Sequence, residues 1–498
     1  MSFSPPSARP APPGHEPEKP VPVWVVLVVL VGVLAIGGFG VKALLLDGKG
    51  SERTYPKTWD ARIQPYAQIA EKKRGLTFLH PVEVRFLPVA KFKKTVTTDE
   101  KELDKDDKEE IEQFTGLMRA LGLLSGDVDL FKESNDLSSG GTLAYYAFDD
   151  ERITIRGERI TPTMRSTLVH ELTHVLQDQH FEVGARIERM SDEEEKDGPS
   201  TSEYSLLRGI LEGDAERVEH LYERSLSPQQ RKALAKSERD ETTEAEQDIK
   251  DVPSVMVALM AAPYALGEGL VQVVAADGGN DAVDDLFRET PRHETALIDP
   301  LRVLSGDVDA ADLDVPDLED GEKSMDSSGE FGTLSWYLML AERLPMKDAL
   351  ATADGWGGDA YTAFTRDGTS CMRAVYEGES PSDTSRMLAS LRRWIAAAPG
   401  STTTATRDGD LVRFESCDPG KSAKGVGKDA SMDALRLLSI RTSLGLGLLR
   451  GGVPDTVARC LAGRLVQEYS VANLSDPKFG ADDPGVQARV RQLAMGCR

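Results

Sequence analysis

The amino-acid sequence predicts a mainly helical α+β protein that is preceded by one transmembrane helix. Three observations predict this: an uncharged apolar run near the N-terminus, long segments with apolar residues at helical spacing, and short alternating segments rich in β-branched residues. Helical patterns dominate up to residue 345, and hairpin patterns follow it. We therefore expect a small sheet packed on helices, and then a C-terminal α+β region that bears the disulfides.

The 498-residue chain divides into segments by composition. From Trp24 to Leu46 only Lys42 carries a charge, and a run of about 20 apolar residues is enough to cross a bilayer. We expect this run to be a single-pass anchor in the cell membrane. The expected segments are a disordered Pro-rich tail (1–22), the transmembrane helix (23–46), a linker (47–60), a main domain (61–345), an α+β hairpin subdomain (346–425) and a helical C-terminal region (426–498).

The four cysteines indicate on which side of the membrane the chain lies. They form an even set without a CxxC pair, which is typical of structural disulfides in an oxidising compartment. We expect Cys371 to pair with Cys417, because both lie on expected strands, and Cys460 to pair with Cys497, although the sequence alone allows three pairings. The charges that flank the anchor weakly favour the opposite orientation, but long domains translocate largely regardless of them. The bulk of the chain is therefore expected to be extracytoplasmic.

The charge balance disfavours one class of partner. The chain has 83 acidic and 59 basic residues and a net charge of −24. A nucleic-acid-binding protein needs a basic face to neutralise phosphates, so we expect no nucleic-acid partner. The Gly-rich segment Gly355–Asp359 is not followed by the Lys-Ser/Thr of a phosphate-binding loop, so it predicts a turn rather than a nucleotide site.

Local patterns order the elements of the main domain. Segments in which β-branched residues alternate with others predict strands. Two of these strands, within 144–157, surround a turn at Asp149-Asp150. Thr161 can cap the helix that follows, with Pro162 at its first position. The expected elements are a strand within 78–89, two strands within 144–157, this capped helix, a loop over 185–203, a helix over 204–226, helices over 228–250 and 254–290, and a loop over 305–328.

The capped helix contains His170-Glu171-Leu172-Thr173-His174, which is an HExxH sequence. Residues four apart share one face of a helix, so the imidazoles of His170 and His174 can both reach one Zn²⁺ ion. Glu171 is turned away from that face by about 100°, where it can act on a metal-bound water without being a ligand. Zinc brings the pKa of such a water to about 7. We therefore expect a zinc site with Glu171 as general base.

A catalytic zinc site needs a third protein ligand and an open position. Glu212 is the expected ligand, because an antiparallel crossing of the next long helix would bring it opposite the histidine pair. Gly213 and Ala215 are small enough to let these two helices approach closely. The other residues of interest are Asp214 and Glu216, which could orient a ligand histidine, His220 and His180 as rival ligands, and Glu219 and Glu223, which we expect on a solvated acidic face.

HExxH followed by a glutamate on a later helix resembles the Glu-zincin metallopeptidases, the thermolysin-like clan. The wider pattern, over residues 74–375, is similar to a family of predicted bacterial zinc metallopeptidases that are often membrane-anchored. The chain departs from that pattern at PRHETALIDP (291–300). The matching motifs are Tyr145-Tyr146, HELTHVLQDQHF (170–181), Glu212-Gly213-Asp214-Ala215, Pro263-Tyr264-Ala265-Leu266-Gly267 with Gly278-Gly279, and Gly355-Trp356-Gly357-Gly358-Asp359.

The resemblance implies a zincin-like core, in which a small sheet packs on the HExxH helix, and a competent zinc site. The expected function is a membrane-anchored, extracytoplasmic zinc metallopeptidase that hydrolyses a peptide or protein substrate with Glu171 as base. Tyr204, Tyr264 and His293 are candidates for stabilising the oxyanion, and the strand over 151–156 is a candidate edge for an extended substrate. Two alternatives stay open: a non-catalytic cell-envelope binding or scaffold protein that keeps the fold, and an amidase that acts on cell-wall peptides.

Overall fold

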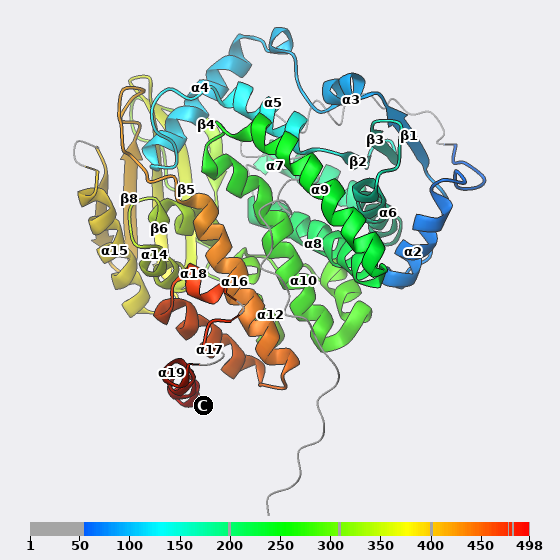
Figure 1. Cartoon of the computed structure of the whole chain (residues 1–498). Helices are drawn as coiled ribbons and strands as arrows, with labels where there is room; N and C mark the ends of the chain where they lie inside the picture. The colour runs from blue at the N-terminus through cyan, green and yellow to red at the C-terminus, as the bar shows by residue number, and fades with distance from the viewer. Residues whose placement is uncertain are drawn as a thin grey trace, which may run out of the picture.

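The computed structural model describes residues 54–197, 201–306, 310–398, 402–476, 478–480 and 483–497 (Figure 1). The expected tail (1–22), the expected transmembrane helix (23–46) and the first half of the expected linker (47–53) lie outside these residues. Mixed α+β architecture with mostly helical content is confirmed for the described part.

A three-stranded sheet lies in the N-terminal part of the fold, with strand order β1-β3-β2. β1 runs parallel to β3, and β2 runs antiparallel to it. The two strands expected around Asp149-Asp150 are therefore confirmed. The elements of this part are α2 (Gln64–Arg74), β1 (Glu83–Leu87), α3 (Val89–Thr95), the short 3₁₀ helix Glu100–Glu102, α4 (Lys105–Ala120), α5 (Leu130–Gly141), β2 (Ala144–Ala147), β3 (Arg152–Arg156) and α6 (Pro162–Phe181).

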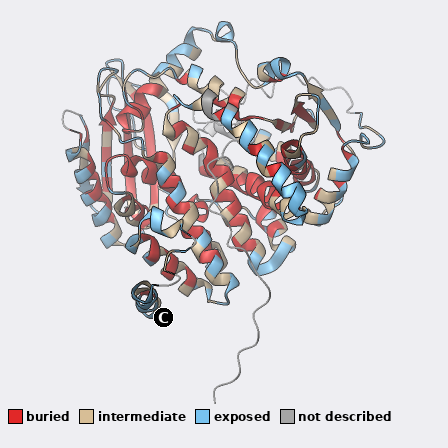
Figure 2. Cartoon of the chain, viewed as in Figure 1, coloured by how far each residue is buried: buried red, intermediate tan, exposed pale blue. Residues whose placement is uncertain are grey.

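Helix α6 begins where the sequence predicts. The Thr161 hydroxyl accepts a hydrogen bond from the Met164 N–H, and Pro162 occupies the first turn, where it needs no donor. Leu168 and Leu172 pack with Ile153 of the sheet in one core cluster. The opposite face of α6 packs on α8 (Thr201–Ser225), so α6 is buried on both sides (Figure 2).

Helix α8 lies against α10 (Ser254–Arg288) at very close range. A Cβ added to Gly213 would lie 2.1 Å from the Gly267 carbonyl carbon, and one added to Gly267 would lie 1.8 Å from the Gly209 oxygen. Only glycine permits this contact. The expectation that Gly213 serves the approach of α6 and α8 is therefore wrong: it brings α10, with Tyr264, next to the HExxH helix.

Helix α10 is the one described helix that is long and apolar enough to span a membrane. However, 72% of its most apolar window is buried inside the protein, and the helix lies at the centre of the fold (Figure 2). Its φ of 69° at Gly279 breaks the helix near its end. This helix therefore has the features of a core helix, and it is weak evidence for a membrane span.

Two expected loops are wrong. Residues 183–197 form helix α7 (Val183–Asp197), and part of the acidic segment 305–328 forms strand β4 (Glu322–Gly329). High charge density misled the prediction, because α7 presents a charged face and β4 is an edge strand with a bulge. The other elements between α8 and the second sheet are α9 (Pro228–Ile249), α11 (Thr295–Ile298), α12 (Leu301–Ser305), α13 (Thr333–Ala341) and α14 (Met346–Ala353).

The second sheet is antiparallel and has the strand order β4-β5-β6-β8-β7. Both expected hairpins are confirmed: β5 (Trp356–Arg366) with β6 (Thr369–Gly378), and β7 (Thr404–Asp408) with β8 (Leu411–Cys417). Helix α15 (Pro381–Ala396) covers one face (Figure 1). Because β4 lies before residue 345 and pairs with β5, the sheet crosses the expected domain boundary.

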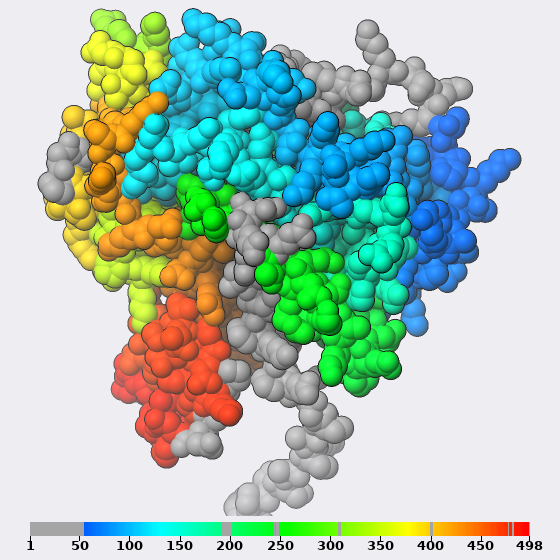
Figure 3. All heavy atoms as spheres, turned by 45° about the horizontal axis from the view of Figure 1, so that its top comes forward, coloured from blue at the N-terminus to red at the C-terminus, as the bar shows by residue number. Residues whose placement is uncertain are grey.

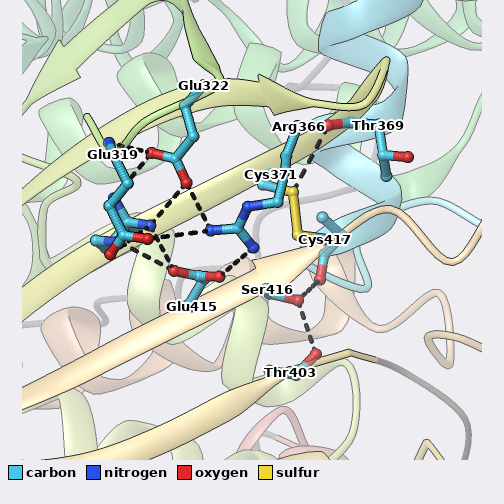
Figure 4. The surroundings of a disulfide bond; sticks show 11 residues. Glu319, Glu322, Arg366, Thr369, Cys371, Thr403, Glu415, Ser416 and Cys417 are labelled. Atoms are coloured by element: carbon cyan, nitrogen blue, oxygen red, sulfur yellow. Dashed lines mark hydrogen bonds and ion pairs between the residues drawn. A yellow bond between two sulfur atoms is a disulfide. The ribbon is translucent and has the colours of Figure 1, made fainter.

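Both expected disulfides are present. Cys371–Cys417 joins directly opposed residues of β6 and β8 (Figure 4), and Cys460–Cys497 ties the chain end to helix α17. The expected helical C-terminal region is confirmed: it comprises α16 (Ser431–Arg450), α17 (Asp455–Glu468), α18 (Val471–Leu474) and α19 (Pro484–Met495). In Figure 3 its last helices lie at the edge of the molecule opposite α2 to α5.

Candidate metal centre

Three side chains from two helices meet between α6 and α8. Nε2 of His170 and Nε2 of His174 each lie 3.3 Å from the same oxygen, Oε2 of Glu212. The two imidazole rings are 4.7 Å apart and nearly perpendicular. The structure thus brings together the three residues that the sequence picks out as metal ligands.

The spacing of these atoms is that of a long hydrogen bond, and it also fits the ligands of one zinc ion. A charge-assisted N–H···O bond is about 2.7–2.9 Å long. Donor atoms that surround zinc tetrahedrally at about 2.0–2.1 Å lie about 3.3–3.4 Å from one another. The two distances of 3.3 Å from the histidine Nε2 atoms to Oε2 of Glu212 match this separation between zinc ligands. Two imidazoles and one carboxylate are also a ligand set that zinc accepts in catalytic sites.

The electrostatics of the three side chains favour a positive charge among them. Burial raises the pKa of Glu212, but the two histidines outweigh burial and hold that pKa well below its usual value. Burial lowers the pKa of His170, yet hydrogen bonds with Glu212 and Glu219 hold it well above its usual value. A cation in this position is therefore stabilised by the surrounding carboxylates.

Glu171 is fully buried beside this group, and neither of its carboxylate oxygens has a hydrogen-bond partner within the described residues. A buried carboxylate without a partner is costly, and burial raises the pKa of Glu171 to about 7, although His174 and His170 partly offset this. Such a carboxylate exchanges protons readily near neutral pH. Among described side chains, Glu171 thus has the protonation behaviour that a general base requires.

The ligand histidines are oriented through their other ring nitrogens. Nδ1 of His170 lies 3.1 Å from Oε2 of Glu219, and Nδ1 of His174 lies 2.8 Å from Oε1 of Gln177. The expectation that Glu219 belongs to a solvated face is wrong, because it is 8% exposed and holds His170. Its position two helical turns after Glu212 could have revealed it. Gln177, three residues after His174 in HELTHVLQDQHF, could have been found by the same reasoning.

The two residues expected to orient a ligand histidine have different positions. Asp214 reaches His174 only indirectly: it accepts a hydrogen bond from Gln177 at 3.2 Å and an ion pair from Arg74 at 2.6 Å. Glu216 is buried near His170 and Glu219, but the carboxylate next to Nδ1 of His170 is that of Glu219. Arg74, contributed by α2, anchors this layer and was not anticipated from the sequence.

The two histidines considered as rival ligands have other partners. His220 bonds Glu268 of α10 at 2.6 Å through Nδ1, with its Nε2 3.9 Å from Glu216. His180 is exposed, and its Nε2 lies 2.8 Å from the Thr77 carbonyl oxygen. Glu223, the other residue expected on a solvated face, is half-buried and accepts a hydrogen bond from Ser166. None of these side chains contacts Glu212 in the described contacts.

Of the three candidates for stabilising the oxyanion, only Tyr264 lies beside the candidate metal ligands. Its ring stacks 6.3 Å from that of His170, and its hydroxyl hydrogen-bonds Glu212 and the guanidinium of Arg208. Tyr204 lies one turn before Arg208 on the wall of an adjoining cavity. His293 pairs with Glu330 at 2.9 Å and is absent from the contacts of the three candidate ligands.

The strand over 151–156 is not an edge strand. It is β3, which pairs with β1 on one side and β2 on the other. The edge strands of this sheet are β1 and β2. β2 is mostly buried and lies next to α6, and Phe148, directly after β2, has its ring 6.4 Å from that of His174.

The expectation of a turn over Gly355–Asp359 is confirmed only at Gly355, because Trp356–Asp359 already belong to β5, which has a register shift between Trp356 and Gly358. The segment has a structural role. The Asp359 carboxylate is 5% exposed and accepts hydrogen bonds from the indole N–H groups of Trp336 and Trp356 and from two backbone N–H groups. This segment therefore fixes the start of the second sheet.

The chain matches no protein-family model, and no similar protein was found among curated proteins or among solved structures.

Proposed function

We propose that this protein is a zinc-dependent hydrolase that cleaves peptide bonds. The observation that carries the proposal is the meeting of two imidazole nitrogens with one carboxylate oxygen at 3.3 Å, beside a buried carboxylate with no partner of its own. His170, His174 and Glu212 would hold the ion. The three-stranded sheet that packs on α6 would then form a zincin-like core with this helix.

Zinc supplies Lewis acidity: when bound, it lowers the pKa of water to about 7 and polarises a carbonyl group. The remaining steps belong to the protein. Glu171 takes the proton of the attacking water and later gives it to the leaving amine. Glu219 and Gln177 keep the two imidazoles in the tautomer whose Nε2 faces inward. The Tyr264 hydroxyl is placed to donate to the developing oxyanion.

An extended substrate would bind along the outer edge of β2, the edge strand next to α6. Main-chain hydrogen bonds to an edge strand hold a peptide in one register. Because β2 packs on α6 and ends near His174, a peptide paired with it would pass the candidate ligands. The two disulfides fit an oxidising, extracytoplasmic location, and the proposed anchor over 23–46 would hold the protein at the cell membrane.

The test is the substitution Glu171→Gln in the full-length protein, with Glu203→Gln as a control on the exposed surface of α8. Losing a general base lowers kcat/KM by about 10²–10⁴-fold, whereas zinc content should stay at the wild-type level because Glu171 is not a ligand. Peptide-library cleavage and elemental analysis give the two readouts. Undiminished cleavage by Glu171→Gln would overturn the assigned role.

The same experiment separates the alternatives. A non-catalytic envelope binding or scaffold protein would hold zinc and cleave no peptide. An amidase would leave linear peptides intact and act on cell-wall peptides instead, again in a manner that depends on Glu171.

A further inference from the structure

A cavity of about 140 Å³ lies between the metal centre and the second sheet. Its walls come from α4, α8, α10 and α13 and from residues of β4, β5 and β6. They are mainly apolar, with Leu117, Leu297 and Leu334 among the buried contributors. A cavity of about 150 Å³ holds one benzene molecule, so this one accommodates a side chain of similar size.

One end of the cavity adjoins the candidate ligands. Arg208 lines it and lies one helical turn before Glu212 on α8. Its guanidinium hydrogen-bonds Tyr264, which in turn hydrogen-bonds Glu212. A molecule in the cavity is therefore separated from the metal centre by a single layer of side chains.

Two carboxyl side chains, those of Glu294 and Glu330, also line the cavity. His293 pairs with Glu330 at 2.9 Å. Glu294 is 7% exposed and is held only by neutral donors, the Leu334 N–H at 3.3 Å and the Ser205 hydroxyl. In the described part of the chain no arginine or lysine bonds it.

Neutral donors alone therefore offset the burial of the Glu294 carboxyl group within the described contacts. Burial, with the neighbouring Glu330, raises the pKa of Glu294 to about 8. A buried carboxylate gains most from a cation that reaches it directly. The cavity thus combines mainly apolar walls with an arginine beside the candidate metal centre and a buried carboxyl group.

We propose that this cavity is a specificity pocket for a lysine side chain of the substrate, with the ammonium group on Glu294. The apolar walls would cover the methylene stem, as such side chains require. Arg208 is placed to bind the substrate main chain where it leaves the pocket. The inference rests on the proposed function, because it places the lysine next to the bond that is cleaved.

The first experiment needs no catalysis. n-Butylammonium, which copies the lysine side chain, and 1-butanol, its neutral counterpart, are titrated calorimetrically into the full-length protein. The ammonium ion should bind more tightly by about 10–100-fold, the usual gain from a hydrogen bond to a charged group. Glu294→Gln, which keeps the acceptor for Leu334 and Ser205, should remove that difference, and the exposed Glu289→Gln should not.

The second experiment uses peptides that differ only in one residue beside the scissile bond, lysine or norleucine. The wild type should favour lysine in kcat/KM by about 10-fold or more, and Glu294→Gln should lose this preference while it still cleaves the norleucine peptide. Equal cleavage of both peptides by the wild type, or equal binding of both small probes, would overturn the pocket assignment. Ammonium binding that depends on Glu294 without cleavage of any peptide would instead overturn the proposed function alone.

Discussion

Two groups of charged side chains in this protein differ in which side chains pair with their carboxylates. On the second sheet, Glu322 and Glu415 each accept hydrogen bonds from both Arg366 and Arg373. Glu319 pairs with the same two arginines, beside the Cys371–Cys417 disulfide (Figure 4).

At the candidate metal centre the partners are different. Glu212 and Glu219 lie against histidine nitrogens rather than against a bidentate arginine, and Glu171 has no hydrogen-bond partner within the described residues. Buried charge without a partner is destabilising. The comparison teaches that the carboxylates of the sheet network are paired by arginine, whereas the group on α6 and α8 is one that a bound cation would stabilise.

The largest of the remaining effects tests the metal centre through Glu219. Glu219→Ala removes the carboxylate that orients His170, and losing such a partner lowers metal affinity by about 10–100-fold. Glu203→Ala, on the exposed face of the same helix, is the matched control. Competition with a zinc chelator measures both variants. An affinity equal to that of the wild type would show that Glu219 does not support the site.

The next effect tests the sheet network. Arg373→Met leaves Glu322, whose side chain is 1% exposed, with Arg366 as its one remaining arginine. We expect the free energy of unfolding to fall by about 2 kcal/mol, as measured by urea denaturation, with zinc content unchanged. Arg413→Met breaks an exposed pair on the same sheet and should cost less than about 1 kcal/mol. Similar losses from the two variants would contradict the distinction.

A smaller effect separates the two regions by pH. Burial raises the pKa of Glu322, but hydrogen bonds from Arg373 and Arg366 outweigh it and lower that pKa to about 2. A carboxyl group with a lowered pKa stabilises the folded state at pH values above its pKa in the unfolded chain. This stabilisation is lost as the pH falls through the folded-state pKa of about 2. Histidine must be neutral to bind a metal. Near pH 4 zinc should therefore dissociate from the protein while amide hydrogen exchange in β5, β6 and β8 stays slow. Loss of zinc together with fast exchange in these strands would contradict this prediction.

The local chemistry of the site could be predicted from the sequence because it depends on short spacings. HExxH fixes His170, Glu171 and His174 on one helix, and Thr161 with Pro162 fixes where that helix begins. Glu212 follows from the need for a third donor on the next long helix. Both disulfides followed from the placement of the cysteines on expected elements.

The remaining features depend on contacts between distant segments. Gly213 packs on Gly267 rather than toward α6, and nothing in the local pattern indicates which neighbour a small residue approaches. Arg74 meets Asp214 across 140 positions. β3 became a central strand because β1 pairs beside it. Glu219 was misread since a charged residue on a long helix is usually solvated, and only the position of His170 reverses that expectation.

The most direct test of the account is the zinc content of the purified full-length protein, measured beside Glu212→Gln, His174→Ala and the exposed control His180→Ala. The account predicts about one zinc ion per chain in the wild type and in His180→Ala, and a large loss in the other two variants. A wild type that binds no zinc, or a His174→Ala variant that binds as much as the wild type, would contradict it.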